Sequence, residues 1–129
     1  MQPRKWCDPS SAFGNPHADA RAWRPPADPA DLEEFRAAVI QHAIAISVRR
    51  AKNALKMTQR QLAAVDGRGQ DALKWNRRLN GQQGLQMVDL SVILRAVPGA
   101  LPSEADMQLL LDVAEKRIPP PSGWAEVDS

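Results

Sequence analysis

The chain has 129 residues, which is the size of one domain with short flanking segments and excludes a large multidomain enzyme. Hydrophobic residues make up 43% of the sequence, aromatic residues only 5%, and tyrosine is absent, which favours packed aliphatic helices over a β-sandwich or barrel. The formal net charge of +2, from 17 basic and 15 acidic side chains, does not by itself indicate a polyanionic partner.

Cys7 is the only cysteine, so no disulfide can form within the chain, and we expect a reducing, cytoplasmic setting. One cysteine and two histidines, His17 and His42, are a poor set of ligands, and we expect neither a metal nor another cofactor. No run reaches the roughly 20 apolar residues of a membrane-spanning helix, and the first ten residues lack the apolar stretch of a secretory signal. We therefore expect no contact with a membrane.

Six of the eleven prolines lie at or before Pro29. No apolar period persists in residues 1–30, which we interpret as a Pro-rich, largely irregular arm without a core of its own. Trp6, Phe13 and Trp23 are exceptions, because three large aromatic side chains are unfavourable in solvent. Either one or two of them pack onto the helical body, or the arm binds a partner protein.

Residues 31–56 contain neither glycine nor proline and are rich in good helix formers, which predicts one helix or two nearly continuous ones. We expect Asp31 to cap the start of this helix. His42 lies at the edge of the apolar face, and we interpret it as a structural or surface histidine. The apolar face has two stripes at helical spacing, Leu32, Phe35, Val39, Ala43 and Ile46 beside Ile40, Ile44, Val48, Ala51 and Leu55.

Shorter helices follow. Thr58 and Asp71 are candidate caps for helices that end near Asp66 and Leu79. The segment 85–97 is apolar on the side formed by Leu85, Val88, Val92 and Val97, which Leu90, Ile93 and Leu94 widen. Ser103 and Asp106 resemble a capping box that opens the last helix, where Met107, Leu110, Leu111 and Ala114 repeat at helical spacing.

The sequence therefore predicts an all-α protein with three parts. Residues 1–30 form the Pro-rich arm, residues 31–117 form a compact bundle of four to five helices, and residues 118–129 form an irregular tail that begins with the prolines at 119–121.

The helices at 58–66 and 71–79, separated by a glycine-containing turn, have the spacing of a helix-turn-helix, whose second helix can enter the major groove of DNA. Between Arg49 and Gln82 there are two acidic residues, Asp66 and Asp71, and nine basic ones, so this window carries +7 and the rest of the chain −5. A positive field at this motif is what phosphate binding requires. The basic residues are Arg49, Arg50, Lys52, Lys56, Arg60, Arg68, Lys74, Arg77 and Arg78.

This segment resembles the helix-turn-helix of the Cro and phage-repressor (Xre-like) superfamily, over about residues 44–97. The resemblance implies a bundle of four or five helices with a recognition helix at about 71–79, capped by Asp71. The matching residues are Thr58-Gln59, Leu62-Ala63, the turn glycine, the string NRRLNG at 76–81, and Asp89-Leu90.

The resemblance implies that Leu62, Ala63, Trp75 and Leu79 are core residues. It places Ala72, Leu73, Asn76 and Arg77 toward the base edges, where arginine can pair with guanine and asparagine with adenine. Positions that contact the DNA backbone in this family correspond to Gln59, Asn80, Gln82 and Gln83. By their charge, Arg60, Arg68, Lys74 and Arg78 suit further phosphates.

Two features depart from the pattern of the family. The turn VDGRGQ is longer than usual if Gly69 is the turn glycine, and the alignment before Asn76 shifts if Gly67 takes that place instead. Lys56 stands where many relatives have a glycine, at a small cost to the backbone.

We expect a sequence-specific DNA-binding transcriptional regulator such as a repressor. We expect a homodimer, because one recognition helix reads only a half-site of double-stranded DNA. The candidate dimer surface is the stripe of Met107, Leu110, Leu111 and Ala114, unless this stripe packs back on the bundle.

The alternative is a protein-interaction module, antitoxin-like or binding the transcription machinery, in which the bundle is a scaffold and the aromatic arm or the last helix binds the partner. We expect no enzymatic activity, because the chain has no nucleophile elbow, phosphate-cradling glycine loop, HExxH or CxxC.

Overall fold

The computed structural model describes residues 2–115, which fold into five α-helices and four short 3-10 helices without a β-strand. The predicted all-α bundle of four to five helices is thereby confirmed. The predicted end of the last helix at residue 117 and the tail at 118–129 lie outside the described residues. The α-helices are α1 (Leu32–Ala54), α2 (Gln59–Val65), α3 (Ala72–Leu79), α4 (Met87–Ala96) and α5 (Glu104–Ala114).

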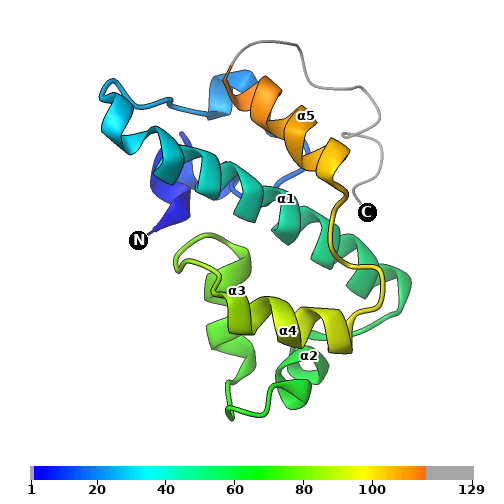
Figure 1. The fold of residues 1–129 in the computed structure, drawn as a ribbon. Coiled ribbons are helices and arrows are strands. Elements are labelled where there is room, and N and C mark those ends of the chain that lie inside the picture. The colour runs from blue at the N-terminus through cyan, green and yellow to red at the C-terminus, as the bar shows by residue number, and fades with distance from the viewer. Residues whose placement is uncertain (1, 116–129) are drawn as a thin grey trace.

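The long helix α1 organises the fold because it is continuous and apolar on a wide face. It runs through the middle of the molecule, with α2, α3 and α4 grouped on one side and α5 on the other (Figure 1). Phe35, Val39 and Val48 of α1 are fully buried, whereas Leu55, just past its end, is exposed. Among residues 2–115, no helix has the length and apolar character needed to cross a membrane.

The N-terminal segment, residues 2–31, shares the core of the bundle. Cys7, Phe13 and Trp23 are buried and belong to the same hydrophobic cluster as α1. Trp23, only 2% exposed, meets Phe35 edge-on with ring centroids 6.0 Å apart. Of the two alternatives for the aromatic side chains, packing on the helical body therefore holds for Phe13 and Trp23. The segment contains the 3-10 helices η1 (Pro3–Trp6), η2 (Ser10–Ala12), η3 (Ala20–Ala22) and η4 (Pro29–Asp31).

The structure confirms two of the predicted helix caps, those at the starts of α2 and α3. The Thr58 hydroxyl accepts a hydrogen bond from the Gln61 amide, and the Gln61 side chain accepts one from the Thr58 amide, which completes a capping box for α2. The Asp71 carboxylate accepts from the Lys74 amide at 2.9 Å and caps α3.

The caps of the outer helices differ in part from the prediction. Ser103 accepts a hydrogen bond from the Asp106 amide at the start of α5, as expected. The prediction that Asp31 caps α1 is wrong, because its side chain makes no capping hydrogen bond. The turn η4 precedes α1 there, and Asp28 caps that turn by accepting from the Ala30 amide.

The buried face of α4 is rotated from the predicted one. Val88 and Leu94 are 44% and 62% exposed, so the prediction that they face the core is wrong. The core side of α4 is made by Val92, Ile93 and Ala96, together with the carboxylate of Asp89. The core side of α4 therefore includes the buried carboxylate of Asp89, and the helix is turned so that Val88 and Leu94 face solvent.

The apolar stripe of α5 packs back on the bundle. Leu110 and Ala114 are buried, and Met107 and Leu111 are partly buried against the core. Of the two alternatives for this stripe, packing back on the bundle therefore holds for Leu110 and Ala114, which leaves a dimer only the partly exposed atoms of Met107 and Leu111.

Candidate nucleic-acid interface

The helix α3 is held to the bundle by a narrow apolar face. Trp75 and Leu79 are completely buried, and Leu62 and Ala63 of α2 lie in the same cluster. This confirms the core positions implied by the resemblance. Because only two of the eight residues of α3 are buried, most of the helix faces away from the core.

The opposite face of α3 is open to solvent. Leu73 is 55% exposed, Asn76 and Arg77 are exposed, and Ala72 is half-buried. The four candidate base-contacting residues therefore lie together on the solvent side of α3. Since Leu73 is a large apolar side chain, its exposure provides a surface that a thymine methyl group could contact.

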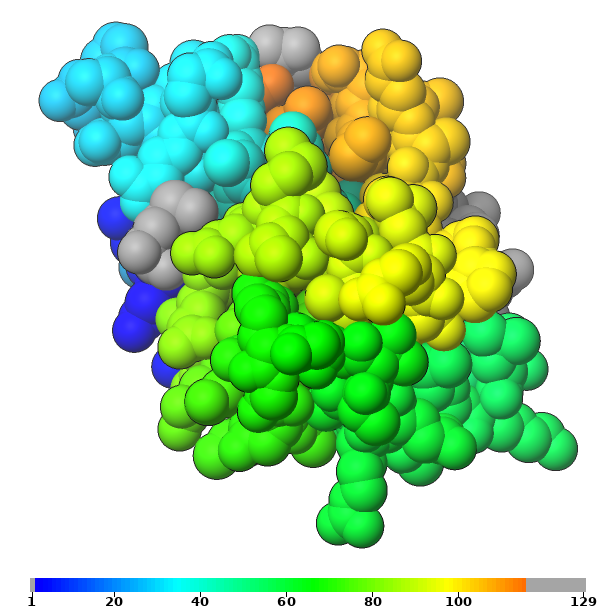
Figure 2. All heavy atoms as spheres, turned by 60° about the horizontal axis from the view of Figure 1, so that its bottom comes forward, coloured from blue at the N-terminus to red at the C-terminus, as the bar shows by residue number. Residues whose placement is uncertain are grey.

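Exposed cations surround this face. Lys56 precedes α2, Arg60 lies on α2, and Lys74 and Arg77 lie on α3, all exposed. None of the four takes part in an ion pair within residues 2–115. The helices α2 and α3, which carry Arg60, Lys74 and Arg77, come together with α4 on the face turned toward the viewer in Figure 2. A field of this sign attracts a polyanion over several ångströms and weakens as salt is added.

Arg68 has a different role from the predicted phosphate contact. Its guanidinium donates to the Asp66 carboxylate at 2.8 Å and to the Asp89 carboxylate at 2.6 Å. The arginine lowers the pKa of Asp66 to about 2, and both carboxylates raise the pKa of Arg68. The prediction of a phosphate contact at Arg68 is corrected, because its charge is already neutralised within the turn and α4.

Arg78 is likewise used inside the domain. Its guanidinium donates to the Gln70 side chain at 2.8 Å, lies 3.6 Å from the Asp89 carboxylate and stands over the ring of Trp75. Its side chain is only 12% exposed. Arg78 therefore fixes α3 to the turn and to α4, which corrects its assignment as a phosphate contact.

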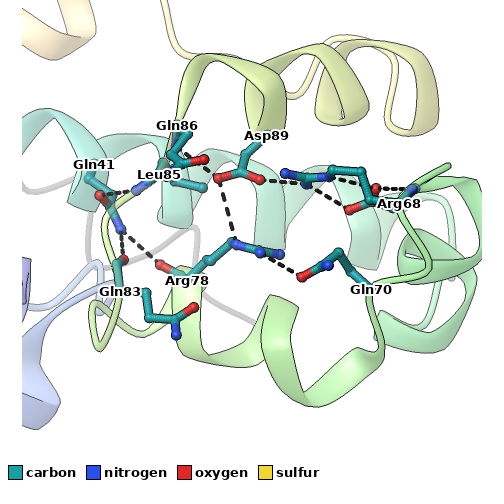
Figure 3. A network of polar contacts seen from close by, with 9 residues as sticks. Gln41, Arg68, Gln70, Arg78, Gln83, Leu85, Gln86 and Asp89 are labelled. Carbon is teal, nitrogen blue, oxygen red and sulfur yellow. Dashed lines mark hydrogen bonds and ion pairs between the residues drawn. The ribbon is translucent and has the colours of Figure 1, made fainter.

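Gln41, a buried residue of α1, was not singled out by the sequence. Its amide nitrogen donates to the carbonyls of Arg78 and Gln83, and its oxygen accepts from the Leu85 amide at 2.7 Å (Figure 3). All polar atoms of this side chain thus hold the connection between α3 and α4. A glutamine in the middle of an apolar helix face is the signal that could have revealed it.

We predict that Asp89→Asn lowers the free energy of unfolding by about 1–3 kcal/mol, because the neutral amide removes the buried carboxylate, 1% exposed, that pairs with Arg78 and is one of the two carboxylates bound by Arg68. Urea unfolding followed by circular dichroism measures the change. Asp106→Asn, an exposed position of α5, is the matched control and should shift stability by less than about 1 kcal/mol. Equal shifts in the two variants would contradict the role of Asp89.

Gln59 connects a buried lysine of α1 to Asn76 of α3. Its side-chain oxygen accepts a hydrogen bond from the Lys52 ammonium, and its nitrogen donates to the side-chain oxygen of Asn76 at 2.7 Å. Lys52 is 9% exposed, and burial together with the nearby Arg49 lowers its pKa. The predicted phosphate-contacting side chain of Gln59 is thus also bonded within the protein.

The remaining predicted phosphate contacts lie in the loop after α3. Asn80 and Gln82 are half-buried, and Gln83 is exposed. Gly81 between them has φ +81°, and a Cβ atom there would lie 2.7 Å from the ring of Phe13. Glycine is therefore required at this place, and the loop is pressed against the N-terminal segment.

A groove lies between α2, the long turn that follows it and the start of α3. The groove has a volume of about 540 Å³, and its lining includes Arg60, Ala64, Gln70 and Leu73. Gly69, with φ +72°, is the turn residue that needs the conformational freedom of glycine, whereas Gly67 does not adopt a positive φ. The additional turn residues therefore separate α2 from the start of α3 without releasing α3 from the core.

Lys56 has φ +54°, the left-handed conformation that glycine adopts most readily, which accords with the backbone cost expected at this position.

Residues 2–115 contain no group of three or more metal-ligating side chains placed to hold an ion. Comparisons with protein-family models, curated proteins and solved structures find no match to this chain.

Proposed function

We propose that this protein is a sequence-specific DNA-binding transcriptional regulator of the Cro and phage-repressor type, with α3 as the recognition helix. The observation that carries the proposal is the two-sided character of α3. Trp75 and Leu79 are buried, while Leu73, Asn76 and Arg77 are exposed beside further exposed cations. An eight-residue helix with this exposed face suits the major groove, which admits an α-helix and presents base edges to it.

The internal polar contacts support the same proposal. Arg68, Arg78 and Gln41 tie α3 and its flanking loops to α1 and α4. A recognition helix held in one orientation loses little conformational entropy on binding, so more of the contact energy appears as affinity. The arginines inside the domain thus position the exposed Arg77 rather than contact phosphates themselves.

We further propose that two copies bind one operator. A single helix of this length reads a few base pairs, and a symmetric pair doubles the site read. Footprinting on the DNA that flanks its gene should then protect two half-sites about one helical turn apart. The apolar stripe of α5 has little free surface to offer such a pair, because Leu110 and Ala114 are buried within the chain.

The alternative of a protein-interaction module has less support from the surfaces first considered for it. Phe13 and Trp23 of the N-terminal segment are buried, as are Leu110 and Ala114 of α5. A partner protein would therefore meet mainly the polar sides of these elements. The proposal of DNA binding, by contrast, rests on the solvent-exposed face of α3, which needs no rearrangement of the domain to meet a ligand.

The decisive experiment measures binding to duplexes selected from a randomised pool, at increasing salt, for the native protein and Arg77→Ala. We expect affinity to fall steeply with salt because phosphate contacts release counterions. Arg77→Ala should weaken binding by about 1–3 kcal/mol and relax the preference at one base pair. Arg21→Ala, which removes the same charge from an exposed site in the N-terminal segment, is the control and should change neither.

Two outcomes would overturn the proposal. One is an affinity for DNA that does not depend on salt. The other is an Arg77→Ala variant that selects the same sequences as the native protein.

A further inference from the structure

The first 3-10 helix of the chain, η1, lies beside the loop that follows α3 (Figure 1). The Arg4 amide donates to the Gly81 carbonyl at 3.0 Å, and a Cβ atom at Gly81 would lie only 2.9 Å from the Cβ atom of Arg4. The loop is itself folded onto α3, because the Gln82 amide donates to the Arg77 carbonyl at 2.9 Å. The side chain of Arg4 therefore begins next to the end of the proposed recognition helix.

The charge of Arg4 is not used inside the domain. Arg4 is half-buried, and its guanidinium takes part in no ion pair or hydrogen bond within residues 2–115. An arginine of this kind buries its aliphatic stem and keeps the guanidinium in water. The other basic side chains of the N-terminal segment all have partners, Lys5 in Glu34, Arg21 in Asp19, and Arg24 in the carbonyls of Lys5 and Cys7.

The loop beside Arg4 carries side chains that the resemblance places at the DNA backbone. Asn80 and Gln82 stand on either side of Gly81, the residue that η1 contacts. Asn80 follows Asn76 by four residues, so both lie toward the same side of α3. A duplex lying along the exposed face of α3 would therefore pass this loop and the cation next to it. The planar guanidinium group matches the oxygens of a phosphate well.

We infer that the N-terminal segment is part of the DNA interface, and that Arg4 contacts a phosphate beside those contacted by the loop after α3. The inference rests on the proposed function and extends its interface beyond the helix-turn-helix. The backbone of Arg4 is held in place before DNA arrives, because its amide is bonded to Gly81 and Phe13 packs on the same glycine. The contact therefore costs the ordering of one side chain only. A phosphate contact adds affinity and reads no base.

Arg4→Gln removes the charge and keeps the Cβ atom and most of the stem. In titrations of labelled duplex at several salt concentrations, the logarithm of the affinity should fall less steeply with the logarithm of salt, by about 0.9, the slope for one phosphate of B-DNA. Near 0.1 M salt the affinity should be about three- to tenfold lower for every sequence. The bases selected from randomised duplexes should remain those of the native protein.

Arg21→Gln is the matched control. It makes the same substitution in the same segment, at an exposed arginine whose charge is paired with Asp19. Arg21 lies on η3, which packs on α5, on the other side of α1 from α3 (Figure 1). Its removal should leave the salt slope unchanged. Arg4→Lys retains the charge and should restore the native slope, and circular dichroism establishes that each variant is folded.

Ethylation interference locates the contact on the DNA. Ethylating the phosphate that Arg4 contacts should weaken binding of the native protein and should have no further effect on Arg4→Gln. The effects of ethylation at the other phosphates should be the same for both proteins.

The outcomes separate the two proposals. If the native protein selects no sequence, the proposed function fails and the inference fails with it. If the native protein selects a sequence but Arg4→Gln has the same salt slope as Arg21→Gln, DNA binding stands and the contact by Arg4 is refuted. A change in the selected bases on Arg4→Gln also refutes it, since the side chain would then read a base. A loss of slope in Arg4→Gln that Arg4→Lys restores supports the inference.

Discussion

Replacing Trp23 by alanine is expected to lower the free energy of unfolding by about 3–5 kcal/mol, the range for truncating a large buried aromatic side chain. Trp23 is almost completely buried and packs edge-on against Phe35 and His42 of α1. Its removal leaves a cavity between the N-terminal segment and the long helix. Such a loss is a large part of the total stability of a small domain.

Chemical unfolding monitored by circular dichroism measures this loss. Met87→Ala is the control, because Met87 is also a large apolar residue but is 81% exposed, and it should change stability by no more than about 0.5 kcal/mol. A Trp23→Ala variant as stable as Met87→Ala would show that the N-terminal segment is not part of the core.

The pH dependence of stability is expected to be dominated by His42 between about pH 6.5 and pH 3. Burial, with a contribution from Arg49, lowers the pKa of His42 to about 3, whereas an unfolded histidine has a pKa of about 6.5. In this interval the unfolded state binds a proton that the folded state does not. The free energy of unfolding therefore keeps the whole contribution of neutral His42 above about pH 6.5. Below that pH it falls by up to about 1.4 kcal/mol per pH unit, and about 4–5 kcal/mol is lost by pH 3.

Urea unfolding at several pH values tests this expectation. His42→Asn keeps an acceptor near Nδ1 for the Gly14 amide but does not titrate, so its stability should depend less steeply on pH. Parallel profiles for the native protein and His42→Asn would refute the assignment.

The helices could be predicted because their signals are local. Freedom from glycine and proline predicted α1, and the caps at Thr58 and Asp71 predicted α2 and α3 to within a residue. The role of the N-terminal segment could not be predicted in the same way. Its order comes from contacts with distant residues, such as Phe13 against Gly81, which no local pattern reveals.

The candidate interface was predictable in part. Helical spacing and the resemblance placed Leu73, Asn76 and Arg77 on one face, and the structure exposes them. The sign of a charge in the sequence does not tell whether an acidic partner lies nearby in the fold, so the sequence alone predicts phosphate contacts for Arg68 and Arg78. Asp89 is the residue that could have revealed the internal role of these arginines. An acidic residue between apolar residues of a helix requires a cationic partner when it is buried.

The contact between the N-terminal segment and the loop after α3 has a consequence for the order of folding. The Arg4 amide donates to the Gly81 carbonyl at 3.0 Å, and Phe13 lies against the same glycine. On the ribosome, residues 2–31 are made before α1 (Leu32–Ala54) and well before the loop after α3, which begins at residue 80. Pairing between such distant parts of the chain slows folding. The N-terminal segment, although it is synthesised before the helices it packs against, is therefore expected to be among the last parts of this domain to reach its native packing.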